Sequence, residues 1–267
     1  MVGSLVQEVD FLSQEMEMKV SGWIAALALL GATGGALAQD VGKYDISGVK
    51  TGMTKEQAEA KLKAEYPNLK LTGSWSYPAQ YGFPESLAQL EYCYGENYCS
   101  NRARIGFLPL SGKIYYIGRS EFLGNISQPE TQTPIKTLIK AFEEKYGAPT
   151  GKYDGIDAKA GNSSDYILSI SMDKNGVPMK RLDDCSPERG HNGPEPVVKK
   201  VSDQCNFWLY YSLQRDRFKN QDFSYHFDLK LKDYSQINSE LKMIFDKKED
   251  IEKKKIEQGA ANKAPKL

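Results

Sequence analysis

The sequence predicts an α+β protein that is built from two helix-on-antiparallel-sheet units in tandem. Three observations support this prediction. Runs of alternating apolar and polar residues are joined by short turns, which is typical of antiparallel strands. A helical pattern precedes each set of these runs. The two helical patterns also end alike, in Glu65-Tyr66-Pro67 and in Lys145-Tyr146 followed shortly by Pro149.

The first helix is expected to begin at Thr54, because Thr54 and Gln57 have the spacing of a capping box. Apolar residues four apart share one face of this helix, and a proline that cannot donate to the helix follows them: Ala58, Leu62, Tyr66 and then Pro67. Upstream of the helix, residues 44–49 are expected to form a short strand.

Four strands are expected after this helix, at residues 69–75, 87–94, 102–108 and 113–120. The last two are joined by Pro109-Leu110-Ser111-Gly112, which has the composition of a hairpin loop. Consecutive strands with short turns form a meander, so one face of the meander is expected to bury the first helix.

A second helix is predicted to be capped by Thr133, with Pro134 at its first position. Its apolar residues recur at helical spacing: Ile135, Leu138, Ile139, Phe142 and Tyr146. Further strands are expected at residues 152–157, 166–172, 205–214 and 222–231. A third helix is expected from Tyr234, with one packing stripe that includes Ile237, Leu241, Ile244 and Phe245.

The N-terminal region has the features of an export signal. Residues 20–38 are apolar and uncharged, and they end in Ala36-Leu37-Ala38, the small-residue pattern of a cleavage site. We expect cleavage before Gln39 and no stable membrane anchor afterwards, so the protein would be periplasmic or secreted. The predicted divisions are residues 1–38 (upstream extension and signal), 39–128 (first unit), 129–246 (second unit) and 247–267 (charged, partly disordered tail).

Four cysteines in an exported chain are expected to form two disulfides. Three connectivities exist, and we favour local pairing. Cys93 and Cys99 enclose a short polar turn, whereas Cys185 and Cys205 bracket a long Pro/Gly-rich segment. No two cysteines stand as C-x-x-C, so we expect neither a metal nor a cofactor.

The turn Gly52-Met53-Thr54, followed by Gln57-Ala58, resembles the turn of bacterial envelope domains grouped with the β-lactamase inhibitor protein and the outer-membrane-assembly small lipoprotein. The resemblance implies a helix packed on an antiparallel sheet. It also implies tandem copies of that unit, as in the β-lactamase inhibitor protein. The predicted mature chain begins with Gln39 and not with cysteine, so the lipid anchor of the lipoprotein is not expected.

The charge pattern argues against a nucleic-acid partner, and two sets of polar residues can be considered as candidates for catalysis or metal binding. Acids and bases balance, at 35 Asp plus Glu against 35 Lys plus Arg, and no basic stripe precedes the C-terminal tail, so no nucleic-acid partner is expected. Ser224, His226 and Asp228 alternate on one predicted strand and could be drawn as a Ser/His/Asp constellation, but no G-x-S-x-G turn is present. A charged loop offers a second set of titratable groups: Asp183, Asp184, Glu188, Arg189 and His191.

Aromatic residues are the candidate binding residues, because aromatic rings dominate binding hot spots. They gather near predicted loops and strand ends: Trp75, Tyr77, Tyr81, Phe83, Tyr94 and Tyr98. We therefore expect a non-catalytic interaction protein of the bacterial envelope. Its partner would be another envelope or secreted protein, although a glycan would use the same rings. The alternative is a hydrolase of cell-envelope polymers.

Overall fold

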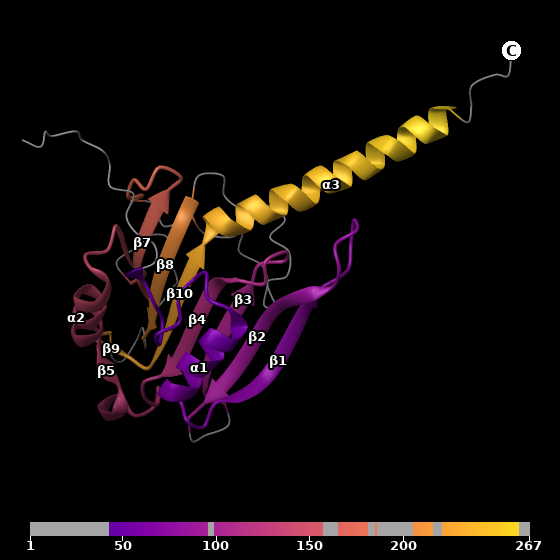
Figure 1. The fold of residues 1–267 in the computed structure, drawn as a ribbon. Helices are drawn as coiled ribbons and strands as arrows, with labels where there is room; N and C mark the ends of the chain where they lie inside the picture. Colours follow the sequence, from indigo (N-terminus) through magenta and orange to yellow (C-terminus); the bar gives the residue numbers. More distant parts are fainter. Residues whose placement is uncertain are drawn as a thin grey trace, which may run out of the picture. The chain divides into compact units, whose positions relative to one another are not determined.

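A computed structural model describes residues 43–95, 99–156, 165–180, 185, 205–215 and 221–261. All of them belong to one compact unit that spans residues 37–267. Its centre is one eight-stranded antiparallel sheet with the strand order β1-β2-β3-β4-β10-β8-β7-β6 (Figure 1). The predicted α+β class is confirmed.

The elements follow the predicted order of helix and then strands, twice. The first set is α1 (Lys55–Glu65), β1 (Lys70–Tyr77), β2 (Ser86–Tyr94), β3 (Asn101–Phe107) and β4 (Ile114–Phe122). The second set is η2 (Pro129–Thr131), β5 (Thr133–Pro134), α2 (Ile135–Tyr146), β6 (Gly151–Asp154), β7 (Asp165–Asp173), β8 (Cys205–Gln214), β9 (Phe223–Ser224), β10 (His226–Asp233) and α3 (Tyr234–Ala261).

The two sets are arranged as two halves that share a single sheet. In each half a helix is followed by four strands of the large sheet, which run inward from one edge. The last strands of the halves, β4 and β10, pair antiparallel, with Arg119 opposite Leu229. The tandem arrangement is therefore built around one continuous sheet. The predicted boundary between residues 128 and 129 falls in the connection between β4 and α2.

Both α1 and α2 pack on the same face of this sheet. One cluster of buried side chains joins Leu62 of α1 and Phe142 of α2 to residues of the central strands, such as Ile117 and Leu209. Thr54 caps α1 through the predicted capping box with Gln57. Because every second residue of the strands points to this face, the other face carries the alternate set of side chains.

Residues 44–49 do not form the predicted strand. Only one isolated bridge occurs there, between Ile46 and Val49, and it closes a turn in which Ser47 and Gly48 have positive φ angles. The apolar residues of the turn are nevertheless fully buried in the main core. The segment thus fills the core by a turn and not by a strand pairing.

The predicted cap of α2 was wrong. Pro134 occupies the N-cap position, and no side-chain hydrogen bond caps the helix. Thr133 instead pairs with Ser224 in the small sheet of β5 and β9, and the backbone N–H of Ile135 donates to the carbonyl of Asp222 at 2.9 Å. A residue distant in sequence therefore accepts from one backbone N–H of the first turn of α2.

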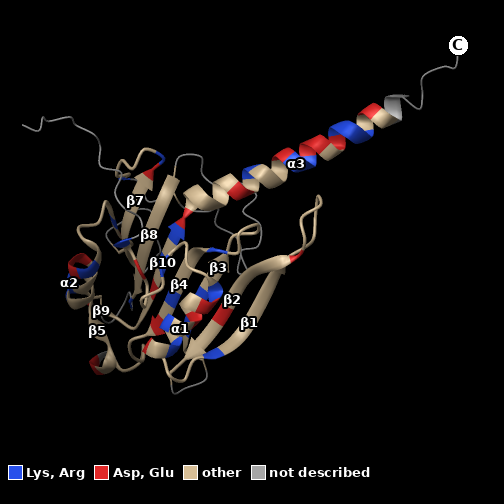
Figure 2. Cartoon of the chain, viewed as in Figure 1, with Lys and Arg blue, Asp and Glu red and all other residues tan. Residues whose placement is uncertain are grey.

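The helix α3 continues to Ala261, beyond the point where the sequence predicted a charged, partly disordered tail. Figure 2 shows acids and bases along this part of the helix. Pairs four residues apart support it, with 2.7 Å between Lys242 and Asp246 and 3.8 Å between Lys248 and Glu252. Residues 262–267 lie outside the described residues. Among the helices described, none is both long and apolar enough to cross a membrane.

Both predicted disulfides are confirmed. Cys93 is bonded to Cys99, and Cys185 is bonded to Cys205. The second disulfide belongs to a smaller apolar cluster with Trp208 and with Tyr234, whose hydroxyl donates to the carbonyl of Cys185 at 2.8 Å. This cluster joins the start of α3 to the sheet face opposite α1 and α2.

Candidate functional site

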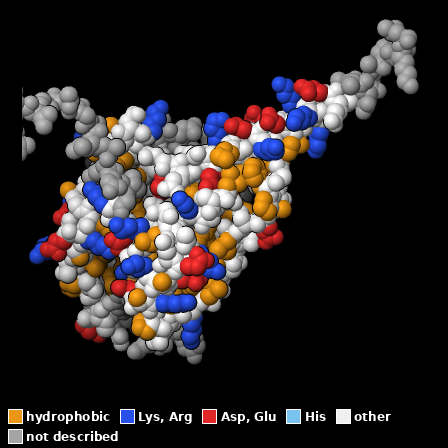
Figure 3. All heavy atoms as spheres, viewed as in Figure 1, with side chains coloured by type: hydrophobic (Ala, Val, Ile, Leu, Met, Phe, Trp, Pro, Cys, Tyr) orange, Lys and Arg blue, Asp and Glu red, His pale blue; other side chains and the backbone are white. Residues whose placement is uncertain are grey.

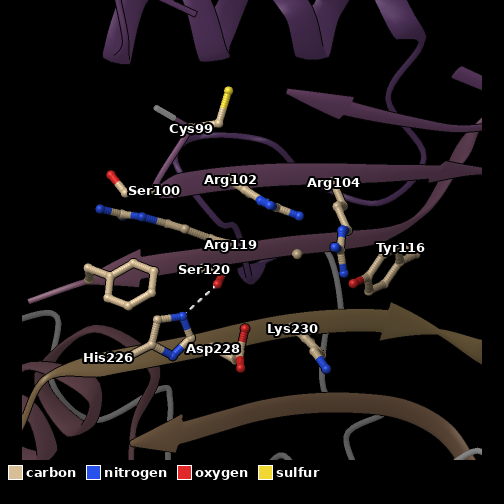
Figure 4. A pocket seen from close by; sticks show the side chains of 12 residues that line it. Cys99, Ser100, Arg102, Arg104, Tyr116, Arg119, Ser120, His226, Asp228 and Lys230 are labelled. Atoms are coloured by element: carbon tan, nitrogen blue, oxygen red, sulfur yellow. Dashed lines mark hydrogen bonds between the residues drawn. The ribbon is translucent and has the colours of Figure 1, made fainter. Parts of the chain in front are cut away.

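The sheet face opposite α1 and α2, here called the open face, contains a hollow of ≈ 480 Å³. The hollow lies over β3, β4 and β10, where the two halves of the protein meet (Figure 4). Both halves contribute polar side chains to it, and these residues are Arg102, Arg104, Tyr116 and Ser120 from the first half and His226, Asp228 and Lys230 from the second. Ligand sites often form at such junctions.

The floor of the hollow is Gly118. One row of paired residues crosses the sheet from Arg104 through Gly118 to Lys230. Because Gly118 has no side chain, the Tyr116 side chain can lie between the two basic residues. The hydroxyl of Tyr116 lies over this glycine, where an added Cβ would collide with it. A side chain at Gly118 would therefore force the Tyr116 ring to move.

Two arginines on β3 border one side of the hollow. Glu91 on β2 accepts from both, at 3.5 Å from Arg102 Nη1 and 2.5 Å from Arg104 Nε. Burial opposes the charge of Arg104, but the hydrogen bond to Glu91 and the nearby negative charges together outweigh burial, so the pKa of Arg104 is raised above its ordinary value. Figure 4 shows Arg104 reaching across β4 toward Tyr116. One carboxylate is thus shared by two guanidinium groups.

A serine and a histidine from different halves border another side. Ser120 Oγ lies 2.8 Å from His226 Nε2, within hydrogen-bond distance. His226 is only 8% exposed, and its Nδ1 has no hydrogen-bond partner among the described residues. Burial lowers the pKa of His226, while the charges of Asp228 and Asp165 act in the opposite direction. The ring is therefore neutral at neutral pH.

The constellation of Ser224, His226 and Asp228 does not form. The Ser224 hydroxyl lies within hydrogen-bond distance of two backbone carbonyls, those of Gln214 at 2.7 Å and His226 at 2.8 Å, and its proton is directed at these and not at His226 Nε2 or Nδ1. Asp228 shares the open face with His226, as predicted, but no hydrogen bond joins the two in the part of the chain that is described. The serine that contacts His226 is Ser120, which the sequence reasoning missed. Only the pairing of β4 with β10 brings them together.

Two of the predicted aromatic binding residues are buried. Tyr77 is 6% exposed, and its hydroxyl donates to the carbonyl of Phe107 at 3.1 Å. Tyr94 is 5% exposed, donates to Glu121 at 2.6 Å and stacks on Tyr66 with 3.9 Å between ring centroids. Both rings therefore act in the core.

The other predicted aromatic residues lie at different places. Trp75 is half-buried on β1, and its indole lies over Gly73. Tyr81 and Phe83 lie in the loop between β1 and β2, where the Lys248 ammonium of α3 is 5.9 Å from the Tyr81 ring centroid. Tyr98 lies outside the described residues. The structure does not bring the five described residues into one cluster, and binding by Trp75, Tyr81 and Phe83 remains a prediction.

The charged loop with Asp183, Asp184, Glu188, Arg189 and His191 also lies outside the described residues. Within the described ranges, no three His, Cys, Asp or Glu side chains gather as metal ligands would. Figure 3 shows acids and bases interspersed over the visible face, without a patch of one sign. The hollow on the open face, where polar side chains from three strands converge, is the candidate site.

No family model, no curated protein and no solved structure matches the chain. The resemblance of the Gly52-Met53-Thr54 turn to bacterial envelope domains accordingly remains a prediction.

Proposed function

We propose that the protein is a non-catalytic binding protein of the bacterial envelope, periplasmic or secreted, which takes a protein partner on the open face of its sheet. The observation that carries this proposal is the hollow at the junction of the halves. It combines a glycine floor with side chains from three strands, including Arg104, Ser120 and Lys230. A volume of ≈ 480 Å³ is that of a ligand pocket and can receive a projecting side chain of a partner.

Export is part of the proposal. Two disulfides join the four cysteines of the chain, and disulfides persist in oxidising compartments outside the cytosol. The pattern Ala36-Leu37-Ala38 supplies a cleavage site for the signal. Intact mass of the exported protein should therefore correspond to a chain that begins at Gln39, and a mass that retains Trp23 would contradict cleavage.

Capture experiments test the binding face. Immobilised mature protein is incubated with envelope extract, and bound proteins are identified by mass spectrometry. Lys230→Glu changes the charge of the hollow, whereas Lys136→Glu makes the same change on the exposed surface of α2. We expect a partner that is retained by the wild type and by Lys136→Glu, and lost by Lys230→Glu. Thermal melts of the three proteins check that each is folded.

The opposite pattern would contradict the proposal. If Lys136→Glu loses the partner and Lys230→Glu keeps it, the partner binds the helix face and not the open face.

A second candidate function is hydrolysis of an envelope polymer, which the Ser120–His226 contact of 2.8 Å favours. A neutral histidine can accept the proton of a serine nucleophile. Binding is the better-supported function because the Nδ1 atom of His226 has no acceptor to orient the ring among the described residues. Turnover of nitrophenyl esters or of envelope polymers that disappears in Ser120→Ala would establish the hydrolase instead.

A further inference from the structure

We infer that the hollow binds an oxyanion, a carboxylate or phosphate group of the ligand, in the space bordered by Arg102, Arg104 and Lys230. This inference rests on the proposed function, because it names the chemistry of the group that the open face receives. Neighbouring strands lie about 4.8 Å apart, so two residues separated by one strand have Cα atoms about 10 Å apart. The Tyr116 hydroxyl covers Gly118 within this span, so the anion is expected above that hydroxyl, within reach of the basic side chains on both sides.

The charges around Gly118 favour an anion. Arg102, Arg104 and Lys230 line the hollow, and Glu91 is the one carboxylate that pairs with the arginines among the described residues. Lys230 has no ion pair among those residues, and its ammonium lies 5.7 Å from the Tyr210 ring centroid. A half-buried ammonium without a carboxylate is stabilised when an anion binds next to it.

The arginine side chains at the hollow also provide N–H donors that suit an oxyanion. A guanidinium carries five N–H groups in a fork, and Arg104 uses its Nε for Glu91. Its terminal Nη groups therefore remain to donate to a carboxylate or phosphate, in the geometry that arginine favours for both. The Arg102 side chain, 48% exposed, points toward the same space in Figure 4.

Asp228 determines which end of the hollow the anion occupies. Its carboxylate stands opposite Ser120, one row away from Gly118. An anion is repelled by this carboxylate and is placed at the Arg104 end. Replacing Asp228 by asparagine removes the repulsion with little change of shape, and so should strengthen anion binding.

Anion titration of the isolated protein tests the inference. Inorganic phosphate and acetate are added separately at constant ionic strength to ¹⁵N-labelled protein, and the amide shifts of residues at the hollow give the affinity. We expect saturable shifts there, affinity about tenfold weaker in Arg104→Gln and in Lys230→Gln, and tighter binding in Asp228→Asn. Lys136→Gln, on α2, should behave as wild type.

The two anions separate the two sources of the group. Shifts with acetate indicate an acidic side chain of a protein partner, whereas shifts with phosphate alone indicate a phosphorylated ligand. Absence of saturable shifts with both anions, or equal affinity in wild type, Arg104→Gln and Lys230→Gln, would overturn the inference. A partner captured through the open face by a protein that binds neither anion would leave the proposed function intact and remove only the oxyanion.

Discussion

Ser120 and His226 form a hydrogen bond of 2.8 Å between the two halves of the protein, from adjacent strands of one sheet. The bond places a buried imidazole at the edge of the hollow. Because His226 is held in its neutral form by burial, this contact links the acid–base state of the site to the stability of the sheet.

His226 is predicted to make the protein less stable in mild acid. Burial lowers its pKa in the folded state, while an unfolded histidine titrates near its ordinary value of about 6.5. As the pH falls through about 6.5, His226 binds a proton in the unfolded state but stays neutral in the folded state. The free energy of unfolding therefore decreases until the pH reaches the pKa of His226 in the folded state. His226→Asn should therefore show a flatter dependence of the unfolding free energy on pH in this window.

The comparison is made by urea unfolding of both proteins at a series of pH values from 8 down to the acid limit of folding. Carboxylates titrate in both proteins, so their contribution cancels in the difference. A difference that stays constant across the window would show that His226 titrates equally in the folded and unfolded states.

Local patterns were sufficient to predict most of the elements. Alternation and turn residues predicted every strand of the large sheet to within a few residues, and the residues at the start and end of α1 were also correct, because Thr54, Gln57 and Pro67 act on neighbouring backbone groups. Two errors are local, the turn at residues 44–49 and the length of α3, and another concerns a long-range contact. The pairing of Thr133 with Ser224 replaced a helix cap, and no local signal indicated it.

The site was predicted only in part for the same reason. Alternation correctly placed His226 and Asp228 on one face, since that follows from a single strand. Ser120 and Gly118 lie more than one hundred residues before His226, and their role depends on the register of β4 against β10. Gly118 also carries no chemical group that a sequence pattern could detect. Tyr77 and Tyr94 were predicted to be binding residues, but both are buried. Their burial depends on the assembled core and could not be predicted from local sequence.

The two disulfides are predicted to differ in their effect on stability. Cys93 and Cys99 are 6 residues apart, whereas Cys185 and Cys205 are 20 apart. Loss of chain entropy in the unfolded state gives about 2 kcal/mol for the short loop and about 3 kcal/mol for the long one. The double serine variant at 185 and 205 should therefore unfold at lower denaturant than the variant at 93 and 99. The reverse order would mean that packing around the short loop outweighs chain entropy.

Arg119 and Glu121 are predicted to depend on each other. Arg119 Nη2 lies 2.6 Å from Glu121 Oε1, which also accepts from the Tyr94 hydroxyl at 2.6 Å. Burial opposes the charge of Arg119, but the Glu121 carboxylate and the neighbouring tyrosine hydroxyls together outweigh burial and raise the pKa of Arg119. Glu121→Leu leaves both donors without their acceptor and should cost about 1 to 3 kcal/mol.

The double variant of Arg119→Met with Glu121→Leu should recover part of this loss, because it removes the uncompensated guanidinium. Denaturant unfolding of the wild type, both single variants and the double variant measures the coupling. Strictly additive losses would show that the two residues act independently.

Phe142 is predicted to be a core residue of α2 and not an interface residue. It is 3% exposed, and its ring stacks on Tyr211 of β8 with 5.4 Å between centroids and 6° between planes. Truncation of a buried phenylalanine to alanine costs about 3 to 5 kcal/mol, a large part of a typical domain stability of about 5 to 15 kcal/mol. Phe142→Ala should therefore lower the melting temperature sharply.

Glu144, two residues further along the same helix, is the matched control. Its side chain is 66% exposed and pairs with Lys140 at 3.6 Å, a surface contact of little net energy. Glu144→Ala should leave the melting temperature almost unchanged. Small and equal shifts in both variants would be incompatible with packing of α2 on the sheet through Phe142. A stable Phe142→Ala protein that fails to capture its partner would instead assign this stripe of α2 to the interface, because a ring that supports the core cannot be removed without loss of stability.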